Sequence, residues 1–222
     1  MTASVKAFVF DVYGTLFDVY SVKEKADELY NGKGYEISML WRQKQLEYSF
    51  LRQLMGKYDT FSNITRDSLR YTLYYLNIQS DSEKEQLLID AYKHLSLFPE
   101  VKDVLTQLKH KKLAVFSNGS RDMLDPLIEY SSLRQLFDKI ISVDDIKQYK
   151  PTPASYGHAL HTLGLEREEI LFMSSNGWDI SGARNFGFKT AWINRKKLPL
   201  EELDVNPHHI YSDLSHILEW VN

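Results

Sequence analysis

Five short apolar runs constrain the fold of this 222-residue chain more than any other feature. They are Val5–Phe10, Leu113–Ser117, Lys139–Val143, Ile170–Ser174 and Lys189–Asn194. Each run is continuously apolar rather than alternating, which is typical of strands in a parallel sheet that is covered on both faces. Four helical patterns lie between these runs, at Pro99–His110, Met123–Tyr130, Pro153–Leu163 and Asp179–Phe186. This alternation predicts a doubly wound α/β domain with a parallel sheet.

One interval breaks the alternation. Between the first and second runs, roughly from Asp18 to Phe98, the sequence holds no convincing strand. Four helical patterns occupy it instead, at Ser21–Asn31, Ser38–Met55, Thr65–Asn77 and Ser82–His94. The interval is far too long for a single crossover helix. We therefore expect a helical cap subdomain at 18–97, inserted into a core domain that is formed by 1–17 and 98–222.

Composition excludes several classes of protein. The net charge is −3, which gives no electrostatic footprint for nucleic acid, and the basic run 195–197 is interpreted as a solvated loop. The absence of cysteine excludes disulfides, thiolate catalysis and cysteine metal sites. No segment approaches the ~20 apolar residues of a membrane span. The N-terminal apolar run is too short for a signal peptide. We expect a cytoplasmic enzyme with neither nucleic acid nor membrane as a partner.

Polar residues stand where the predicted strands end. Asp11 follows the first run, 117–120 closes the second, Lys150 follows the third after a loop, and 174–176 closes the fourth with Asp179 close behind. Each group alone is compatible with a turn or a helix cap. Because ligands of open α/β sheets bind at the carboxyl ends of the strands, the four groups together predict one active site.

The segment FVFDVYGTLF around Asp11 resembles the first motif of the haloacid dehalogenase superfamily, whose aspartate is a covalent nucleophile. The resemblance implies a Rossmann-like core. The superfamily's phosphatases carry a second aspartate two residues later, where this chain has Tyr13, and its metal-dependent members carry paired acids in the fourth motif, where this chain has SSNGWD at 174–179. These departures point away from phosphoryl transfer and imply no metal and no organic cofactor. A phosphatase of the same fold and a non-catalytic binding protein remain as alternatives.

The cap segment LWRQKQLEY at 40–48 resembles that of the L-2-haloacid dehalogenases, as do SNGS, YKP and SSNGWD in the core. The resemblance covers the chain from Phe8 to about Asn194. It implies hydrolytic removal of halide from short-chain L-2-haloalkanoic acids, with inversion at C2. The products would be D-2-hydroxy acids and halide, formed through an ester on Asp11.

The resemblance assigns the chemistry to Asp11, Thr15, Arg42, Ser117, Asn118, Lys150, Tyr156, Ser174, Asn176 and Asp179. In these assignments Thr15 and Lys150 hold the nucleophile Asp11. Asp179 is the base for the hydrolytic water and is positioned with Ser174 and Asn176. Arg42, together with Asn118, stabilises the departing halide. Tyr156 orients or supports its neighbours.

The substrate-binding residues that the resemblance implies are Val12, Tyr13, Arg42, Gln43, Leu46, Phe61, Ser117, Asn118 and Trp178. Among them, Ser117 and the backbone amides near Val12, Tyr13 and Asn118 bind the substrate carboxylate. The side chains of Tyr13, Gln43, Leu46, Phe61 and Trp178 form an apolar wall around the carbon and the halogen.

The predicted helix Thr65–Asn77 carries two apolar faces. One face holds Leu69, Leu73 and Leu76, and the other holds Tyr71, Tyr74, Tyr75 and Ile78. A helix that is apolar on both sides is either buried or shared with a partner. A thin cap offers little interior, so we expect a homodimer through the cap helices. The alternative is a helix enclosed within the cap.

Overall fold

The computed structural model describes residues 4–79 and 81–220 and contains a six-stranded parallel sheet in the order β5-β4-β1-β6-β7-β8. The strands are β1 Ala7–Phe10, β4 Lys112–Ser117, β5 Lys139–Ser142, β6 Ile170–Ser174, β7 Lys189–Ile193 and β8 His209–Tyr211. The predicted doubly wound α/β fold is confirmed. The edge strand β8 was missed, because its three residues are largely exposed and carry no continuous apolar run.

Strand β1 lies at the centre of this sheet, and all four of its residues are buried. It pairs with β4 on one side and β6 on the other, so that Phe10 is level with both Val115 and Met173. The strand order reverses at β1, and such a switch point opens a crevice beyond the carboxyl ends of the strands. The residue that follows Phe10 is therefore placed at the middle of the crevice.

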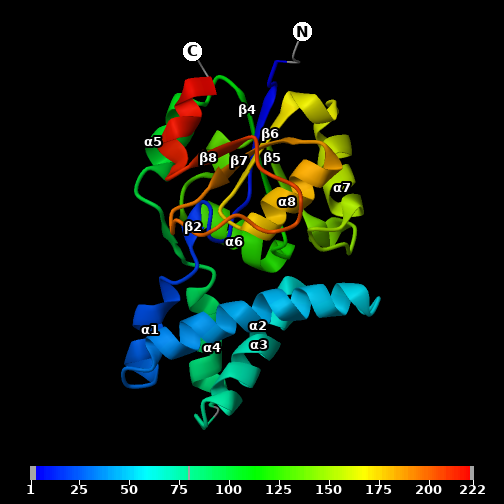
Figure 1. Cartoon of the computed structure of the whole chain (residues 1–222). Coiled ribbons are helices and arrows are strands. Elements are labelled where there is room, and N and C mark those ends of the chain that lie inside the picture. The colour runs from blue at the N-terminus through cyan, green and yellow to red at the C-terminus, as the bar shows by residue number, and fades with distance from the viewer. Residues whose placement is uncertain (1–3, 80, 221–222) are drawn as a thin grey trace.

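Helices cover both faces of the sheet. They are α5 Val101–Gln107, α6 Arg121–Tyr130, α7 Pro153–Leu163 and α8 Gly177–Phe186, with short 3₁₀ segments at Arg134–Leu136, Val143–Asp145, Arg167–Glu169 and Leu214–Trp220. Figure 1 shows α5 beside the C-terminal 3₁₀ segment at one side of the sheet and α7 and α8 at the other. None of the helices in the described parts of the chain combines the length and the apolar character that a membrane span requires.

Four further helices lie together beyond the carboxyl ends of the strands (Figure 1). They are α1 Val22–Leu29, α2 Gly34–Leu54, α3 Phe61–Tyr75 and α4 Ser82–Ala91. The long helix α2 packs between α1 and α3, and the buried indole of Trp41 donates a 2.8 Å hydrogen bond to the carbonyl of Thr65. We propose that 18–97 is a cap subdomain over a core of 1–17 and 98–222.

A two-stranded antiparallel ladder joins these helices to the sheet. It pairs β2 Phe17–Asp18 with β3 Ser96–Leu97, and the amide of Phe98 adds a bond to the carbonyl of Leu16. The sequence pattern predicted no strand here, because two residues are too few to show a period. The ladder ties the segment after Asp11 to the returning chain.

The helix α3 presents two faces, as its sequence pattern indicates. Leu69 and Leu73 are fully buried against the other helices, whereas Tyr74 and Tyr75 are 85% and 63% exposed. The aromatic face of α3 is thus an outer surface of the chain.

Gly34 lies at a point where α2 approaches α1 closely. A Cβ atom at this position would lie 2.2 Å from the carbonyl oxygen of Lys23 and 2.6 Å from the side chain of Asp27. We expect Gly34→Ala to lower the free energy of unfolding by about 1–3 kcal/mol through overpacking. The control is Gly157→Ala in α7, where the nearest atom would be 3.9 Å away. Gly157→Ala should be neutral or stabilising by up to ~1 kcal/mol. Equal urea midpoints for the two variants would contradict this account.

Candidate active site

Asp11 is the first residue after β1, and its buried carboxylate is held by four side-chain donors. Its Oδ2 accepts hydrogen bonds from Thr15 Oγ1 at 2.9 Å, Asn176 Nδ2 at 2.9 Å and Ser174 Oγ at 3.2 Å. Its Oδ1 accepts from Lys150 Nζ at 3.0 Å. The donors come from three segments of the core, so the carboxylate is fixed in orientation before any ligand arrives.

The turn after Asp11 explains why Thr15 faces it. Gly14 adopts a φ of +91°, a conformation that L side chains rarely take, and the amides of Thr15 and Leu16 both bond to the carbonyl of Val12. The chain folds back on itself, and the Thr15 hydroxyl reaches Oδ2 of Asp11. The amide of Ser175 donates to the same hydroxyl at 2.8 Å, which links this turn to the loop after β6.

Lys150 lies between two carboxylates. Its buried ammonium donates to Asp11 at 3.0 Å, to Asp179 Oδ2 at 2.6 Å and to the carbonyl of Phe116 at 3.1 Å. Burial by itself would lower the pKa of Lys150, but the charges of Asp11 and Asp179 outweigh it and raise that pKa above its ordinary value. The lysine is therefore charged. Its backbone amide donates to Asn118 Oδ1 at 2.9 Å, which fixes the loop that carries it.

Asp179, in the first turn of α8, is completely buried. Tyr156 donates to its Oδ1 at 2.8 Å, and Lys150 occupies its other oxygen. Burial raises the pKa of Asp179 to about 6 and the Asp11 charge acts in the same direction, although Lys150 and Tyr156 oppose the shift. A carboxylate with such a pKa is a stronger base than an ordinary aspartate and is still ionised at neutral pH.

Arg42 reaches the core from the cap helix α2. Its guanidinium donates to Gln45 Oε1 at 2.7 Å and makes longer contacts of 3.5 Å with the carbonyl of Tyr13 and with Asn176 Oδ1. The residue is only 7% exposed, yet it forms no salt bridge with any acid in the described residues. A buried charge without a partner is costly, so this guanidinium is suited to bind an anion.

Asp11, Lys150 and Arg42 line one small cavity of about 10 Å³, whereas Thr15, Ser174 and Asp179 are not among its lining residues. Its lining residues are Asp11, Tyr13, Arg42, Leu46, Phe61, Asn118, Lys150, Asn176 and Trp178. The rings of Tyr13 and Phe61 lie 5.4 Å apart and form an apolar wall opposite the charged groups. The arrangement can present a fixed carboxylate to an apolar carbon centre while a cation accepts negative charge on the other side.

The sequence-based assignment of Gln43 needs correction. Gln43 is exposed and does not line the cavity, because one residue along a helix turns the side chain by about 100° away from Arg42. The buried partner of Arg42 is Gln45, whose amide also donates to Thr65 Oγ1 at 2.7 Å. The i,i+3 spacing from Arg42 was the available signal for Gln45.

Two other predicted side chains take places that differ from their assigned roles. The side chain of Ser117 is buried and does not line the cavity, and its hydroxyl accepts the amide of Gly119 at 2.9 Å. The Val12 side chain is buried too, but the assignment of Val12 concerns the backbone amide and stays a prediction. Ser174 contacts Asp11 rather than Asp179. Thus Ser174, like Asn176, belongs to the set that holds the nucleophile candidate and not to the surroundings of the base candidate.

Arg195 was interpreted as part of a solvated loop, and the structure corrects this. Its guanidinium donates to the carbonyl of Thr15 at 3.0 Å, pairs with Glu100 and lies 4.0 Å over the ring of Phe98. It thereby supports the turn that carries Thr15. No local sequence signal could have found it, since Thr15 lies 180 residues away in the chain.

The donor set around Asp11 does not fit a resident metal ion. Magnesium is bound through the lone pairs of oxygen ligands. The lone pairs of the Asp11 carboxylate are already taken by hydrogen bonds from Thr15, Ser174, Asn176 and Lys150. Within 4–79 and 81–220, no group of three or more histidine, cysteine, aspartate or glutamate residues is arranged to hold a metal. The ammonium of Lys150 occupies the space between the two carboxylates.

Comparison with known proteins agrees with this geometry. A sequence model for haloacid dehalogenase-like hydrolases matches residues 5–187. The chain belongs to the haloacid dehalogenase-like hydrolase family. Within this family it is 46% identical to the (S)-2-haloacid dehalogenase of Pseudomonas sp. (strain YL), over 97% of this chain and 94% of that protein.

Solved structures of the family give the same result. The L-2-haloacid dehalogenase from Xanthobacter autotrophicus superposes with a TM-score of 0.94 at 38% identity, and the match covers 98% of each chain. A structure of that enzyme with chloropropionic acid covalently bound superposes with a TM-score of 0.92 at 38% identity, again over 98% of each chain.

The hydrogen bond from Tyr156 to Asp179 lowers the pKa of the candidate base, and this pKa determines the acid limb of the pH profile. Asp179 has to be ionised to accept a proton, so kcat should fall as the pH drops through about 6. Because the Tyr156 hydroxyl stabilises the carboxylate, Tyr156→Phe should move this limb to higher pH. The control is Tyr149→Phe, which removes a buried hydroxyl that bonds to the carbonyl of Asp59 instead. An unshifted limb in Tyr156→Phe, or an equal shift in Tyr149→Phe, would disprove the assignment.

Proposed function

We propose that this chain is a hydrolytic L-2-haloacid dehalogenase that converts short-chain L-2-haloalkanoic acids to D-2-hydroxy acids and halide. One observation carries the proposal. The fixed carboxylate of Asp11 lines a partly apolar cavity that is also lined by Arg42, whose buried guanidinium forms no salt bridge with an acid of the described residues. A nucleophile and an anion acceptor on the two sides of one carbon centre are what a displacement of halide requires. The likeness to named haloacid dehalogenases supports the same reading.

In the first step Asp11 attacks C2 of the haloacid. Oδ2 is occupied by three donors, and Oδ1 has only the Lys150 contact among the described residues, so we assign the attack to Oδ1. The new bond joins Oδ1 to C2. The carbon–halogen bond breaks, and the halide leaves with the electron pair toward Arg42 and Asn118. Attack from the back inverts C2, and the apolar walls keep water away from the carboxylate.

In the second step water attacks the carbonyl carbon of the Asp11 ester. Negative charge then develops on Oδ2, where Thr15, Ser174 and Asn176 already donate, so these three groups stabilise the tetrahedral intermediate. Asp179 takes the proton of the water, with Lys150 between the two carboxylates. The intermediate collapses, and the bond from the carbonyl carbon to Oδ1 breaks. The departing Oδ1 takes the proton from Asp179, so the hydroxy acid leaves with Oδ1 as its hydroxyl oxygen, and Asp11 keeps the water oxygen and loses the second water proton to solvent.

The pocket for the substrate carboxylate stays a prediction at Ser117 and at the amides near Val12, Tyr13 and Asn118. The magnesium-dependent phosphatase is less well supported, because Tyr13 and Ser174 stand where that chemistry needs acids and the donors around Asp11 do not suit a cation. A cytoplasmic location stays an expectation from composition.

Isotope labelling tests the proposed reaction. In a single turnover in ¹⁸O-water, with enzyme in excess over L-2-chloropropionate, we expect one chloride per product. The product hydroxyl should be almost unlabelled, and the peptide that contains Asp11 should gain the label, because the first product oxygen comes from Asp11. Mass spectrometry of both species measures this.

Each other result has a clear meaning. A labelled first product with an unlabelled Asp11 would replace the covalent step by direct attack of water. Release of phosphate from phosphate esters without release of chloride, dependent on magnesium and lost on chelation, would favour the phosphatase and reject the dehalogenase. The D enantiomer serves as the control substrate and should release little chloride.

We also infer that two copies pair through the cap helices, since the exposed aromatic face of α3 continues onto α2. Tyr71 and Tyr75 stack with their centroids 6.1 Å apart, and the ammonium of Lys44 lies 4.4 Å over Tyr71. Such a continuous apolar surface is typical of an interface.

A charge in this face should separate the copies. We expect Tyr75→Glu to shift the mass measured by light scattering from dimer to monomer. The control is Tyr130→Glu on α6 of the core, since Tyr130 is 64% exposed and Tyr75 is 63% exposed. A monomeric wild type, or an unchanged mass in Tyr75→Glu, would contradict the inference.

A further inference from the structure

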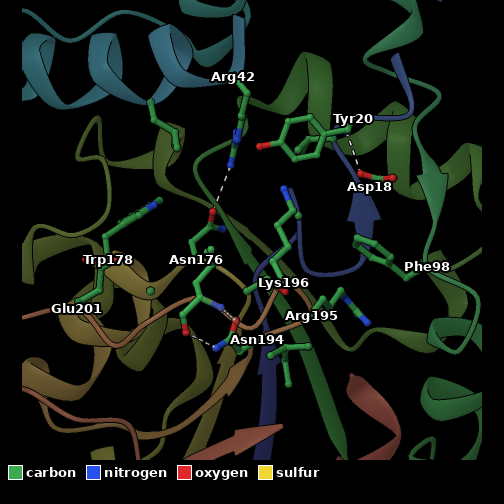
Figure 2. Close-up of a pocket in the computed structure, with 17 residues that line it drawn as sticks. Asp18, Tyr20, Arg42, Phe98, Asn176, Trp178, Asn194, Arg195, Lys196 and Glu201 are labelled. Carbon is green, nitrogen blue, oxygen red and sulfur yellow. Dashed lines mark hydrogen bonds between the residues drawn. The ribbon is translucent and has the colours of Figure 1, made fainter. Parts of the chain in front are cut away.

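A second and larger cavity, of about 420 Å³, lies between the cap and the core (Figure 2). It is built from the segment after Asp11, the loop after β6, the loop after β7 and the cap helix α2. It shares four lining residues with the catalytic cavity: Arg42, Leu46, Asn176 and Trp178. These four side chains are the wall between the two spaces.

The catalytic cavity by itself is too small for a substrate. Its volume of about 10 Å³ has room for roughly one water molecule, so a haloacid enters only when a wall gives way. Within the shared wall, the contacts of Arg42 to Tyr13 and Asn176 are both 3.5 Å long and therefore weak, whereas its bond to Gln45 within the cap is 2.7 Å. Arg42 is thus held firmly to the cap and only weakly to the core, so the shared wall can open at this side chain. We therefore take the larger cavity as the route to Asp11.

The larger cavity carries a cation without an acid partner. The ammonium of Lys196 lies 3.9 Å over the ring of Tyr20 and forms no salt bridge with the acids of the described residues. Its neighbour Arg195 also lines the cavity but is neutralised by Glu100. In Figure 2 the ammonium of Lys196 comes from the core and the guanidinium of Arg42 comes from the cap, and both point toward the same space.

Other polar groups of the cavity were weighed with these two. Asp18 and Glu201 line it as well; Asp18 accepts the amide of Tyr20 at 2.9 Å, and Glu201 lies beside Gly177. Two residues of its wall, Trp178 and Ser175, also carry a buried donor, Nε1 and Oγ, without a hydrogen-bond partner among the described residues, but both atoms are closed off from the cavity. The two cations, Lys196 and Arg42, therefore favour an anionic ligand with oxygen acceptors.

We propose that this larger cavity is an antechamber that binds small monocarboxylate anions, with Lys196 and Arg42 as the two cations that hold the carboxylate. The proposal rests on the proposed function for the identity of the natural ligand: the 2-haloacid pauses here on its way in and the 2-hydroxy acid on its way out. Leu46 and Trp178 give the ligand's alkyl group an apolar surface. On passage into the catalytic cavity Arg42 releases the carboxylate to the predicted pocket at Ser117 and the nearby amides, which leaves the guanidinium available for the halide.

Calorimetric titration with propionate, a carboxylate that carries no halogen, tests the antechamber without any turnover. We expect Lys196→Gln to weaken propionate binding about fivefold, which is the size of one charge contact in water, and Lys196→Arg to restore most of it. The matched control is Lys197→Gln, which removes the same charge from the next residue; Lys197 is exposed, as Lys196 is, but it does not line the cavity. Lys197→Gln should leave the affinity unchanged.

Kinetics supply the second measurement. With L-2-chloropropionate the loss in Lys196→Gln should fall on kcat/KM and should disappear near 1 M salt, where charges are screened within about 3 Å. Equal effects of Lys196→Gln and Lys197→Gln, or no effect of either on propionate affinity, would overturn the proposal. The proposal would also be overturned if Lys196→Gln weakened the binding of chloride, titrated in the same way, but not the binding of propionate. Absence of halide release would reject the proposed function, and the propionate titration would still decide the antechamber.

Discussion

The structure depends on one buried ammonium. Lys150 lies between Asp11 and Asp179, and without it two carboxylates would share an interior that excludes water. Removing one member of a buried ionic group typically costs about 3–5 kcal/mol, because the remaining charges lose their compensation. The positions of the first strand, of α8 and of the loop that carries Lys150 are therefore coupled through this contact. The same contact fixes Oδ1 of Asp11, the candidate nucleophile, and opposes the rise that burial causes in the pKa of Asp179, the candidate base.

The second constraint is the way in which the cap completes the site. The core alone supplies a carboxylate, its donors and the amide of Asn118, but it supplies no cationic acceptor for a departing anion in the catalytic cavity, because Lys150 is already paired with two carboxylates. Arg42 provides that acceptor from α2, and Gln45 and Thr65 hold it from within the cap. Because α2 is also the helix that packs against both of its cap neighbours, the position of Arg42 is set by the packing of the whole cap. Opening the cap would thus change electrostatics and access together.

The two cavities differ in size and in lining residues, which suits them to different steps of the proposed reaction. The small one is charged and built around fixed donors, which favours reaction over binding. The larger one is roomier and has a free cation, which favours capture over reaction. Arg195 links them structurally, since it supports the turn of Thr15 on one side and lines the larger cavity on the other.

The sequence by itself determined the parallel sheet, the long helical insertion and most of the residues that meet at the site. It could do so because strand and helix periods are local, and because polar residues at strand ends are brought to one edge by any parallel sheet. The short ladder β2–β3 and the edge strand β8 were not predictable in this way, since two or three residues carry no period.

Only the tertiary structure decided which polar group faces which. Lys150 and Asp11 are 139 residues apart, and Arg195 and Thr15 are 180 apart, so no local pattern connects them. The burial of Gln45 rather than Gln43 depends on which face of α2 packs against α3, where Gln45 donates to Thr65. The antechamber exists only because the cap and three core segments enclose it. Chain pattern fixes which residues can take part in the chemistry, whereas packing across long sequence separations fixes their distances, their burial and hence their charges.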